Sequence, residues 1–309
     1  MTVGAELNRT FSGHAAPRLC PLCDGKAAGT AFPYTFRFNA HDFEHVSCGS
    51  CGCVYVDPVP DAETFAKMYA KASYHDAHYI DRKDEGYTQS AKLLRKFLPH
   101  GARVLDYGCG LGPFLNALTQ EGLEGTGVEF DAEAVRYAAE NTGRPVFTTA
   151  EFLSDSSMER YDAIYLCDVV AHLPEPVAIL RSILRFLRPG GVLFVEGPLP
   201  TNPSLVYFAA RLFGAMKRRF NPGASVEAPP THLVLANAAQ HRALFARTAP
   251  SLTILHWRIY ETGWPYAEGG AIKRAIAALA SALGGKSIGG IAFGNRFQAI
   301  YRLGEADSQ

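Results

Sequence analysis

Long apolar runs are missing from this sequence. No stretch of about 18 uninterrupted apolar residues occurs, so we expect no membrane-spanning helix. The opening segment, MTVGAELNRTFSGHAAPR, also lacks the apolar core of a secretory signal. It predicts a disordered tail over residues 1–18 and a cytoplasmic protein. Internal repeats and long low-complexity segments are absent as well.

An excess of charge of either sign is also missing. The 309 residues include 30 Lys+Arg and 30 Asp+Glu, so the formal net charge is zero. This balance argues against the broad basic face that duplex DNA binding requires. Apolar residues make up 48% and charged residues 19% of the chain, which predicts a packed core rather than global disorder. The length allows one large domain with an appendage, or two domains.

Four of the seven cysteines form two pairs near the N-terminus, CPLC at 20–23 and CGSC at 48–51. Two such knuckles can hold one zinc ion between four thiolates, which leaves no open coordination position and indicates a structural role. A module this small has little core of its own, so the metal would supply folding energy. We expect a zinc-ribbon-like domain over residues 19–60, with unligated thiols as the alternative. The predicted zinc ligands are Cys20, Cys23, Cys48 and Cys51.

Residues 61–100 have the pattern of a helical linker or lid. Asp61 is a plausible N-cap, and the segment closes at Pro99-His100-Gly101. Its tyrosines can form a lid over a site, although an aromatic stripe is more often part of a core. These tyrosines are Tyr69, Tyr74, Tyr79 and Tyr87.

From residue 101 onward, short apolar strands alternate with helical segments. Such alternation predicts a doubly wound, mostly parallel α/β sheet whose strands are buried on both faces. Two late strands, at 252–261 and 295–303, are expected to pair antiparallel at its edge. They flank a helix in which Ile272, Ile276, Leu279 and Leu283 share a face. The five earlier strands are predicted at Arg103–Tyr107, Gly125–Phe130, Pro145–Thr149, Ala163–Cys167 and Val192–Glu196.

The stretch DYGCGLG follows the first of these strands and precedes a helix. Its glycines, Gly108, Gly110 and Gly112, would let a ligand approach the backbone closely. The dinucleotide motif requires glycine or alanine at the next position, where this chain has Pro113. Asp106 would repel a pyrophosphate and attract an ammonium or a sulfonium. The pattern therefore favours S-adenosylmethionine, which carries both cations and no phosphate.

Further candidate cofactor residues follow the next strands of the predicted sheet. Glu129 ends the second strand, where a carboxylate can accept hydrogen bonds from two ribose hydroxyls. Phe130 beside it could face the adenine ring, and Glu151, after the third strand, could accept from the adenine amino group. Asp168 follows the fourth strand, at the carboxyl edge where ligands of open α/β sheets bind.

Four motifs in this order resemble those of the class I S-adenosylmethionine-dependent methyltransferases. VLDYGCGLG resembles the family's first motif, GVEFD its acidic second, YDAIYLCDVVAHLPEP its fourth-strand motif and LRPGGVLFVEGP its fifth. The resemblance implies a Rossmann-like sheet of seven strands, the last antiparallel, within a methyltransferase domain over 101–309 that carries an insertion at 198–250. It also implies cofactor contacts from Asp106, Gly108, Gly110, Gly112, Glu129 and Asp168.

The N-terminal segment resembles the zinc-ribbon cap of some bacterial methyltransferases that act on sugars or other small secondary metabolites. The similarity lies in a cysteine knuckle, a proline-containing strand exit and a tyrosine-rich helix, CGCVYVDPVPDAETFAKMYAKASYHDAHY. It implies a small-molecule methyltransferase, with O- or C-methylation of a sugar or a related metabolite.

Two histidines are candidates for the proton acceptor that a hydroxyl substrate needs. His172 lies just past the fourth strand in DVVAHLPEP, where the family pattern has EHL and this chain has Ala171 in place of the carboxylate. His232, in PPTHLVLAN within the insertion, is the second candidate. Helix capping or packing is the alternative role of each.

Other readings of the chain fit the sequence less well. The zero net charge disfavours an RNA methyltransferase that binds RNA with the ribbon. Enzymes that methylate base amino groups usually have an Asn/Asp-Pro-Pro-aromatic motif after the fourth strand, where this chain has CDVV. A non-catalytic binding module is disfavoured by the intact acidic and glycine positions. The apolar-to-basic segment Ser204–Phe220 is expected to cap the acceptor pocket rather than to touch a membrane. The sequence does not indicate an oligomeric state.

Overall fold

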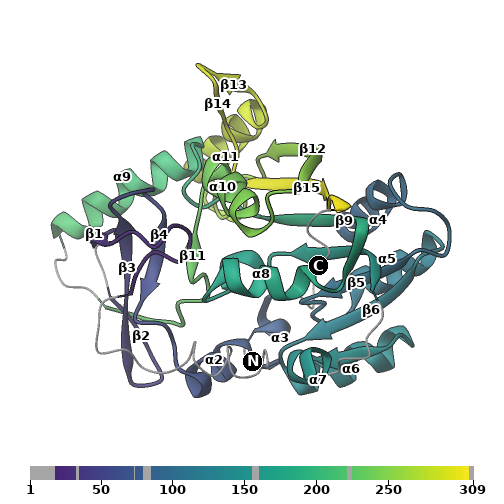
Figure 1. Cartoon of the computed structure of the whole chain (residues 1–309). Helices are drawn as coiled ribbons and strands as arrows, with labels where there is room; N and C mark the ends of the chain where they lie inside the picture. The colour runs from purple at the N-terminus through teal and green to yellow at the C-terminus, as the bar shows by residue number, and fades with distance from the viewer. Residues whose placement is uncertain are drawn as a thin grey trace.

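The structure, a computed structural model, describes residues 18–32, 35–72, 74–78, 85–154, 160–220 and 225–305. Its main element is a seven-stranded sheet of order β12-β15-β9-β8-β5-β6-β7 (Figure 1). The five strands from β9 to β7 are parallel, and β15 runs antiparallel to both β9 and β12. The strands are β5 (Arg103–Tyr107), β6 (Glu124–Glu129), β7 (Val146–Thr148), β8 (Tyr161–Cys167), β9 (Leu187–Pro198), β12 (Thr253–Tyr260) and β15 (Arg296–Arg302).

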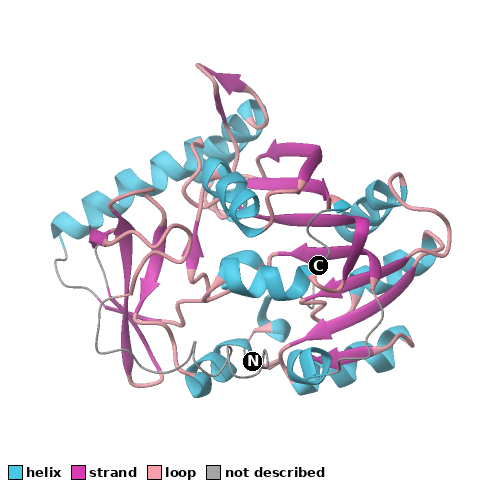
Figure 2. Ribbon diagram, in the orientation of Figure 1, coloured by secondary structure: helices cyan, strands magenta, loops and turns pink. Residues whose placement is uncertain are grey.

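Helices cover both faces of this sheet (Figure 2). Val104 and Tyr165 belong to the core under α4 (Glu85–Arg95) and α5 (Pro113–Gln120). Their neighbours Leu105 and Ile164 belong to the core under α8 (Pro176–Leu184) and α10 (Ala238–Thr248). Because successive strand residues point to opposite faces, both faces need apolar side chains, and the continuous apolar runs of the sequence result. The remaining helices beside the sheet are α6 (Ala132–Thr142) and α7 (Thr149–Ser154).

Four of the five predicted parallel strands match the observed bounds to within two residues, whereas β9 begins five residues earlier than predicted, at Leu187. The two late strands, β12 and β15, pair antiparallel as expected, with β15 placed between β12 and β9. Before the sheet, residues 61–100 form α2 (Ala62–Tyr69), α3 (His75–His78) and α4, and the Asp61 side chain caps α2 by accepting from Thr64 N–H. Tyr79 and residues 1–17 lie outside the described residues. Arg18, assigned to the tail, is buried and donates to the Val56 carbonyl at 2.7 Å.

A second, smaller sheet contains the cysteine-rich segment. Its order is β10-β2-β3-β4-β11, and β1 pairs with β3. Two of its strands come from the 198–250 insertion rather than from residues 19–60, so the insertion and the N-terminal segment fold together (Figure 1). The strands are β1 (Ala27–Thr30), β2 (Thr35–Phe38), β3 (His41–Cys48), β4 (Val54–Asp57), β10 (Ser225–Glu227) and β11 (Val234–Leu235).

Late in the chain, α11 (Ala271–Leu283) buries a different face from the one its sequence suggests. Ala277 and Ala280 are buried, whereas Ile272 and Leu279 are exposed. The reason is that α11 packs its small residues against α9 (Leu205–Phe220), where close approach of two helices is possible. A two-stranded hairpin of β13 (Ser287–Ile288) and β14 (Ile291–Ala292) follows α11. Within the described ranges, no helix has both the length and the apolar character needed to cross a bilayer.

The contrast between buried and exposed leucines gives a stability prediction. Leu118 of α5 is 0% exposed, and Leu279 of α11 is 59% exposed. We expect Leu118→Ala to lower the free energy of unfolding by about 2–5 kcal/mol, because it removes buried methyl groups and leaves a cavity. Leu279→Ala, the matched control, should change it by less than about 0.5 kcal/mol. Urea denaturation followed by circular dichroism measures both, and equal losses would contradict the packing described for α5 and α11.

Candidate functional site

A cavity of about 620 Å³ opens at the carboxyl ends of β5, β6 and β8. This is the edge at which open α/β sheets bind ligands. The cavity wall brings together residues that are distant in the sequence. Among those predicted from the sequence, the wall includes Asp106, Gly108, Gly110, Glu129, Phe130, Asp168 and His172.

The glycine turn between β5 and α5 forms one side of the cavity. Gly108 has a φ of 82°, and a Cβ there would lie 2.4 Å from Val169 Cγ2. Both the left-handed backbone and the contact require glycine. Gly110 has a φ of 54°, and its N–H donates to Glu129 Oε2 at 2.9 Å. The turn is thereby tied to the end of β6.

Asp106 places a buried carboxylate at the floor of the cavity. The residue is 2% exposed, and its Oδ2 has no hydrogen-bond partner among the described residues. Burial, reinforced by the charge of Glu129, raises the pKa of the Asp106 carboxyl well above its usual range. A buried oxygen without a partner is costly, and a cationic ligand in the cavity would satisfy it.

Glu129 lies beside Asp106 at the end of the neighbouring strand. Its Oε1 accepts from the Phe130 N–H at 2.5 Å, and its second oxygen accepts from Gly110. Carboxylate oxygens have further lone pairs, so Glu129 can still accept hydrogen bonds from a ligand. The Nε2 of His75, on α3, lies 3.9 Å from Glu129 Oε1.

Aromatic rings and a histidine from outside the sheet complete the wall of the cavity beside Asp106 and Glu129. Phe130 meets Phe65 of α2 edge-on, with ring centroids 5.0 Å apart. Sequence reasoning missed Phe65 and His75. No local sequence pattern could have identified them, because their place at the cavity depends on how α2 and α3 pack against the glycine turn. Of the predicted lid tyrosines, Tyr69, Tyr74 and Tyr87 line the cavity.

Asp168 ends β8 in a left-handed conformation, with a φ of 56°. Such a backbone is uncommon for a residue with a side chain and marks local strain at a site. Its Oδ1 accepts from the Arg296 guanidinium at 2.6 Å, and Arg296 Nε lies 3.3 Å from the Tyr260 hydroxyl. Sequence reasoning missed Arg296. Because β15 is antiparallel to its neighbours, the first residue of that strand reaches the carboxyl edge.

His172 follows β8 in a single turn, Val170–His172, and its ring meets those of Tyr69 and Tyr74 edge-on, with centroids 5.4 and 5.8 Å away. Its Nδ1 is 2.7 Å from the Thr231 carbonyl oxygen, so this nitrogen carries the ring hydrogen. The Nε2 lone pair then accepts from the Tyr74 hydroxyl at 3.3 Å, and Tyr69 donates to the same Thr231 carbonyl at 2.6 Å. Burial and the neighbouring His232 lower the pKa of His172 to about 3. The imidazole is therefore neutral over the physiological range.

Three predicted site residues lie outside the lining of the cavity. Gly112 begins α5 and faces α6, where a Cβ would lie 2.6 Å from Thr142 Cγ2, so helix packing requires this glycine. Glu151 accepts from the backbone and side chain of Thr148, both at 2.8 Å, while Ala150 faces the cavity. The His232 ring lies behind that of His172, with centroids 4.9 Å apart.

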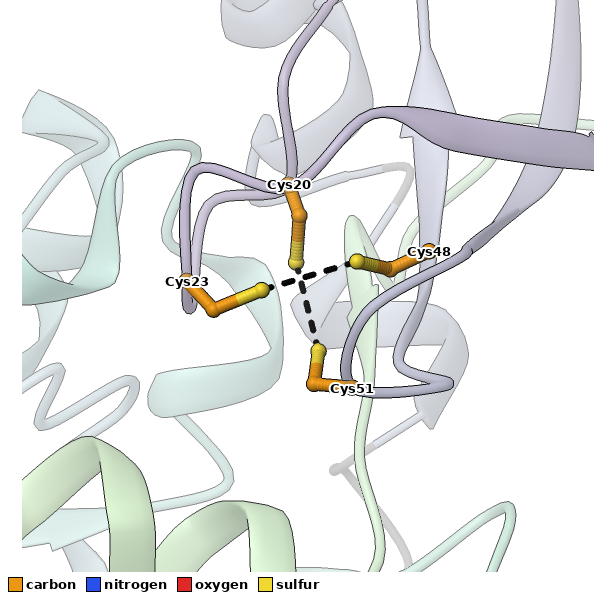
Figure 3. A group of neighbouring side chains, drawn as sticks. All are labelled: Cys20, Cys23, Cys48 and Cys51. Carbon is orange, nitrogen blue, oxygen red and sulfur yellow. Dashed lines mark hydrogen bonds between the residues drawn. The ribbon is translucent and has the colours of Figure 1, made fainter.

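The four paired cysteines converge on one point in the small sheet (Figure 3). Their sulfurs all lie within 4.8 Å of one another, with Cys20 to Cys51 at 3.6 Å and Cys23 to Cys48 at 3.5 Å. Tetrahedral zinc with bonds of about 2.3 Å places its sulfurs at nearly these separations. The four residues therefore fit a structural zinc ion.

The cysteine-rich sheet also supports the wall of the cavity. Strand β4 pairs with β11, and the Val56 N–H donates to the Leu233 carbonyl at 3.0 Å. The His45 side chain of β3 hydrogen-bonds with the backbone of His232. This backbone continues directly into Thr231, whose carbonyl holds His172 and Tyr69. The small sheet thus sets the position of the residues around His172.

Comparison with known proteins adds three findings. A family model described as a methyltransferase domain matches residues 79–249, more than half of the chain. A ubiquinone biosynthesis O-methyltransferase of Xanthomonas axonopodis pv. citri (strain 306) is 32% identical over 123 residues, 38% of this chain and 50% of that protein. The enzyme of that name from Alkalilimnicola ehrlichii is 32% identical over 118 residues, 35% of this chain and 46% of that protein. The chain spans about half the length of these curated relatives.

Among solved structures, the magnesium protoporphyrin IX methyltransferase of Synechocystis PCC 6803, determined with bound SAH, has a TM-score of 0.50 and 14% sequence identity. The match covers 79% of this chain and 100% of that one. At this identity the likeness concerns the fold, and it agrees with the seven-stranded sheet described above.

Proposed function

This chain belongs to the methyltransferase-domain family, and from that premise we propose that it transfers a methyl group from S-adenosylmethionine to a hydroxyl of a small molecule, a sugar or a related metabolite. One observation carries the donor assignment: Asp106 and Glu129 present buried carboxylates to one cavity, and Asp106 Oδ2 has no partner among the described residues. A dinucleotide would bring phosphates to these charges, whereas S-adenosylmethionine brings an ammonium and a sulfonium.

The donor half of the cavity divides its tasks among few residues. Asp106 would accept a hydrogen bond from a cationic group, and Glu129 from ribose hydroxyls. Phe130 and Phe65 offer apolar ring surface nearby for a base. When bound, S-adenosylmethionine supplies a methyl group attached to a positively charged sulfur. The residues of the chain align the reactants and exclude water, which are the main requirements of a displacement.

The acceptor half is assigned to His172 and the tyrosines around it. Because Thr231 fixes the Nδ1 hydrogen, Nε2 holds the lone pair that can take a proton from a hydroxyl. Tyr74 donates to this nitrogen in the free protein, so a bound acceptor hydroxyl would take the place of the Tyr74 hydroxyl there. His232 supports His172 from behind and does not line the cavity.

The acceptor class rests on the size of the cavity and on the N-terminal resemblance. A volume of about 620 Å³ is typical of small-ligand sites rather than of grooves for polymers. The curated relatives are named for O-methylation in ubiquinone biosynthesis, which supports oxygen as the methylated atom. Glycosides and phenols therefore form the two panels of acceptors to compare, and a faster reaction with glycosides supports the sugar assignment.

The cysteine cluster is proposed to hold one structural zinc ion. Four sulfurs around one point leave no open position for a substrate, so the metal would stabilise the small sheet. Through β4 and β11 it would also hold Thr231 in place. The metal has no step in the reaction.

Removal of the Asp106 charge tests the donor site. Asp106→Asn keeps the shape of the side chain, and we expect the Kd for S-adenosylmethionine to rise at least about 30-fold, because a charge-assisted hydrogen bond is lost. The melting temperature should stay equal or rise, since an unpaired buried carboxylate has been removed. Titration calorimetry measures the first and calorimetric unfolding the second.

The pH dependence of donor binding shows whether the charge of the Asp106 carboxylate, rather than its shape, determines the affinity. Because its pKa is raised, Asp106 keeps its proton to a higher pH than an ordinary aspartate does, and binding of a cationic ligand favours loss of that proton. Wild-type affinity should therefore increase with pH until that carboxyl is ionised, and affinity of Asp106→Asn should lack this component. Unchanged binding by the variant would show that the donor lies elsewhere.

His172 is tested with the first acceptor from either panel that supports turnover. We expect His172→Ala to lower kcat at least about tenfold, below the usual general-base factor of about 10²–10⁴, because a pKa of about 3 makes the imidazole a weak base. The Kd of the donor should change little. Because its pKa is about 3, His172 stays neutral between pH 8 and pH 5. The wild-type kcat, measured at saturating donor, should therefore not fall as the pH is lowered through the ordinary histidine pKa of about 6.5. A His172→Ala variant with wild-type turnover would remove His172 as the base, and His41→Ala, at the exposed first residue of β3, is the control.

Metal analysis tests the cysteine cluster. We expect about one zinc per chain in the purified protein. Cys23→Ser should lose most of it. Cys53→Ser should keep it, because Cys53 contacts Cys20 but is not one of the four cysteines whose sulfurs converge. Mass spectrometry under native conditions measures the content. Zinc-free wild-type protein with intact secondary structure would refute the assignment.

A further inference from the structure

The long helix α9 continues its apolar face beyond the surface it packs against. In the first turns, Leu205, Val206 and Ala209 pack on the group that includes Tyr266, Ala277 and Ala280. The same helical face then continues at intervals of three and four residues, where the side chains are exposed. These later residues, named here the α9 face, are Leu212, Phe213, Met216 and Phe220, which are 62%, 45%, 51% and 81% exposed.

This exposure differs from the role expected for the segment. None of the residues that line the cavity comes from α9, so the helix does not cap the acceptor pocket in the described structure. In Figure 1, α9 lies along the upper margin of the molecule, next to α11. Four large apolar side chains grouped on one face mark an interaction surface rather than the scattered exposure that most proteins show.

The charge around the α9 face identifies its partner. The chain as a whole is neutral, yet segment 205–220 contains Arg211, Lys217, Arg218 and Arg219 and no Asp or Glu. Segment 270–292, which includes α11, adds Lys273, Arg274 and Lys286, again without an acidic residue. A concentration of positive charge in a neutral chain complements an anionic surface.

Two other partners fit this surface less well. A second copy of the chain, related by a twofold axis, would bring two basic segments together, and like charges would repel. A nucleic acid would neutralise the basic residues, but its phosphates would leave Leu212, Met216 and Phe220 in a polar surrounding. An anionic lipid surface offers both negative headgroups and an apolar layer beneath them.

We propose that α9 is an interfacial helix that docks this protein on an anionic lipid bilayer. The 16 residues of α9 extend over about 24 Å, and the α9 face enters the boundary between headgroups and acyl chains while the positive charge of the segment attracts the anionic headgroups. The contact is peripheral, because no described helix can span a bilayer. This proposal is independent of the methyl-transfer reaction and needs neither donor nor acceptor.

Vesicle co-sedimentation of the full chain tests the proposal. Vesicles of phosphatidylcholine with about one-third phosphatidylglycerol should retain the protein, and pure phosphatidylcholine should bind it at least about tenfold more weakly. Raising the salt concentration should release it, because screening weakens the attraction. Equal binding to both vesicles, or none to either, would overturn the proposal.

Matched variants locate the contact. Met216→Ser/Phe220→Ser should weaken binding to anionic vesicles at least about tenfold, since two exposed apolar side chains no longer enter the bilayer. Arg211→Glu/Arg219→Glu should do the same at low salt. The control Ile254→Ser/Leu255→Ser removes two exposed apolar side chains from β12 and should bind as the wild type does. Equal melting temperatures would show that all three variants are folded.

Self-association is the competing outcome and has its own readout. Sedimentation velocity without lipid compares the wild type with Met216→Ser/Phe220→Ser. We expect both to sediment with the same profile. A wild-type oligomer that the double variant loses, together with absent vesicle binding, would assign the α9 face to a second copy of the chain and refute the lipid proposal.

Discussion

The burial of Asp106 is the constraint on which the site depends. A carboxylate at the end of a central strand, with one oxygen lacking a partner, is unfavourable in the free protein. The surrounding structure holds it there by other means. Strand β5 pairs with β6 and β8 on its two sides, and the glycine turn after it is tied to Glu129. The strand pairing and the tied turn thus offset the unfavourable burial of Asp106. A cationic ligand would supply the hydrogen-bond partner that Asp106 Oδ2 lacks.

The two sheets depend on each other more closely than their separation in the sequence suggests. The cysteine-rich strands border the 198–250 segment, which supplies β10 and β11 to the same small sheet. Gln240 of α10 donates to the Cys51 carbonyl at 2.8 Å, and Arg247 donates to the Leu22 carbonyl at 2.6 Å. These bonds anchor the segment that carries Thr231. A metal bound by the cysteines would therefore stabilise the acceptor side of the cavity at a distance, without touching a substrate.

The cavity and the α9 face differ in where their apolar side chains lie. Around the cavity, rings from α2 and α3 line the wall beside a polar floor. On α9, apolar side chains remain uncovered beside a concentration of basic residues. The first arrangement suits a ligand that is enclosed, and the second suits a surface that the protein meets from outside. The two features lie on different elements, so each can change without loss of the other.

The sequence by itself determined the parallel strands, the glycine turn with Asp106 and Glu129, and the pairing of the cysteines. These features depend on local periodicity and short spacings, which neighbouring residues impose on one another. Only the tertiary structure decided the partners that come from elsewhere in the chain. His75 and Phe65 reach the cavity by the path of α2 and α3, Arg296 reaches Asp168 by the reversed direction of β15, and the close approach of α6 requires Gly112. Such contacts depend on how whole elements pack, and no short window of sequence contains that information.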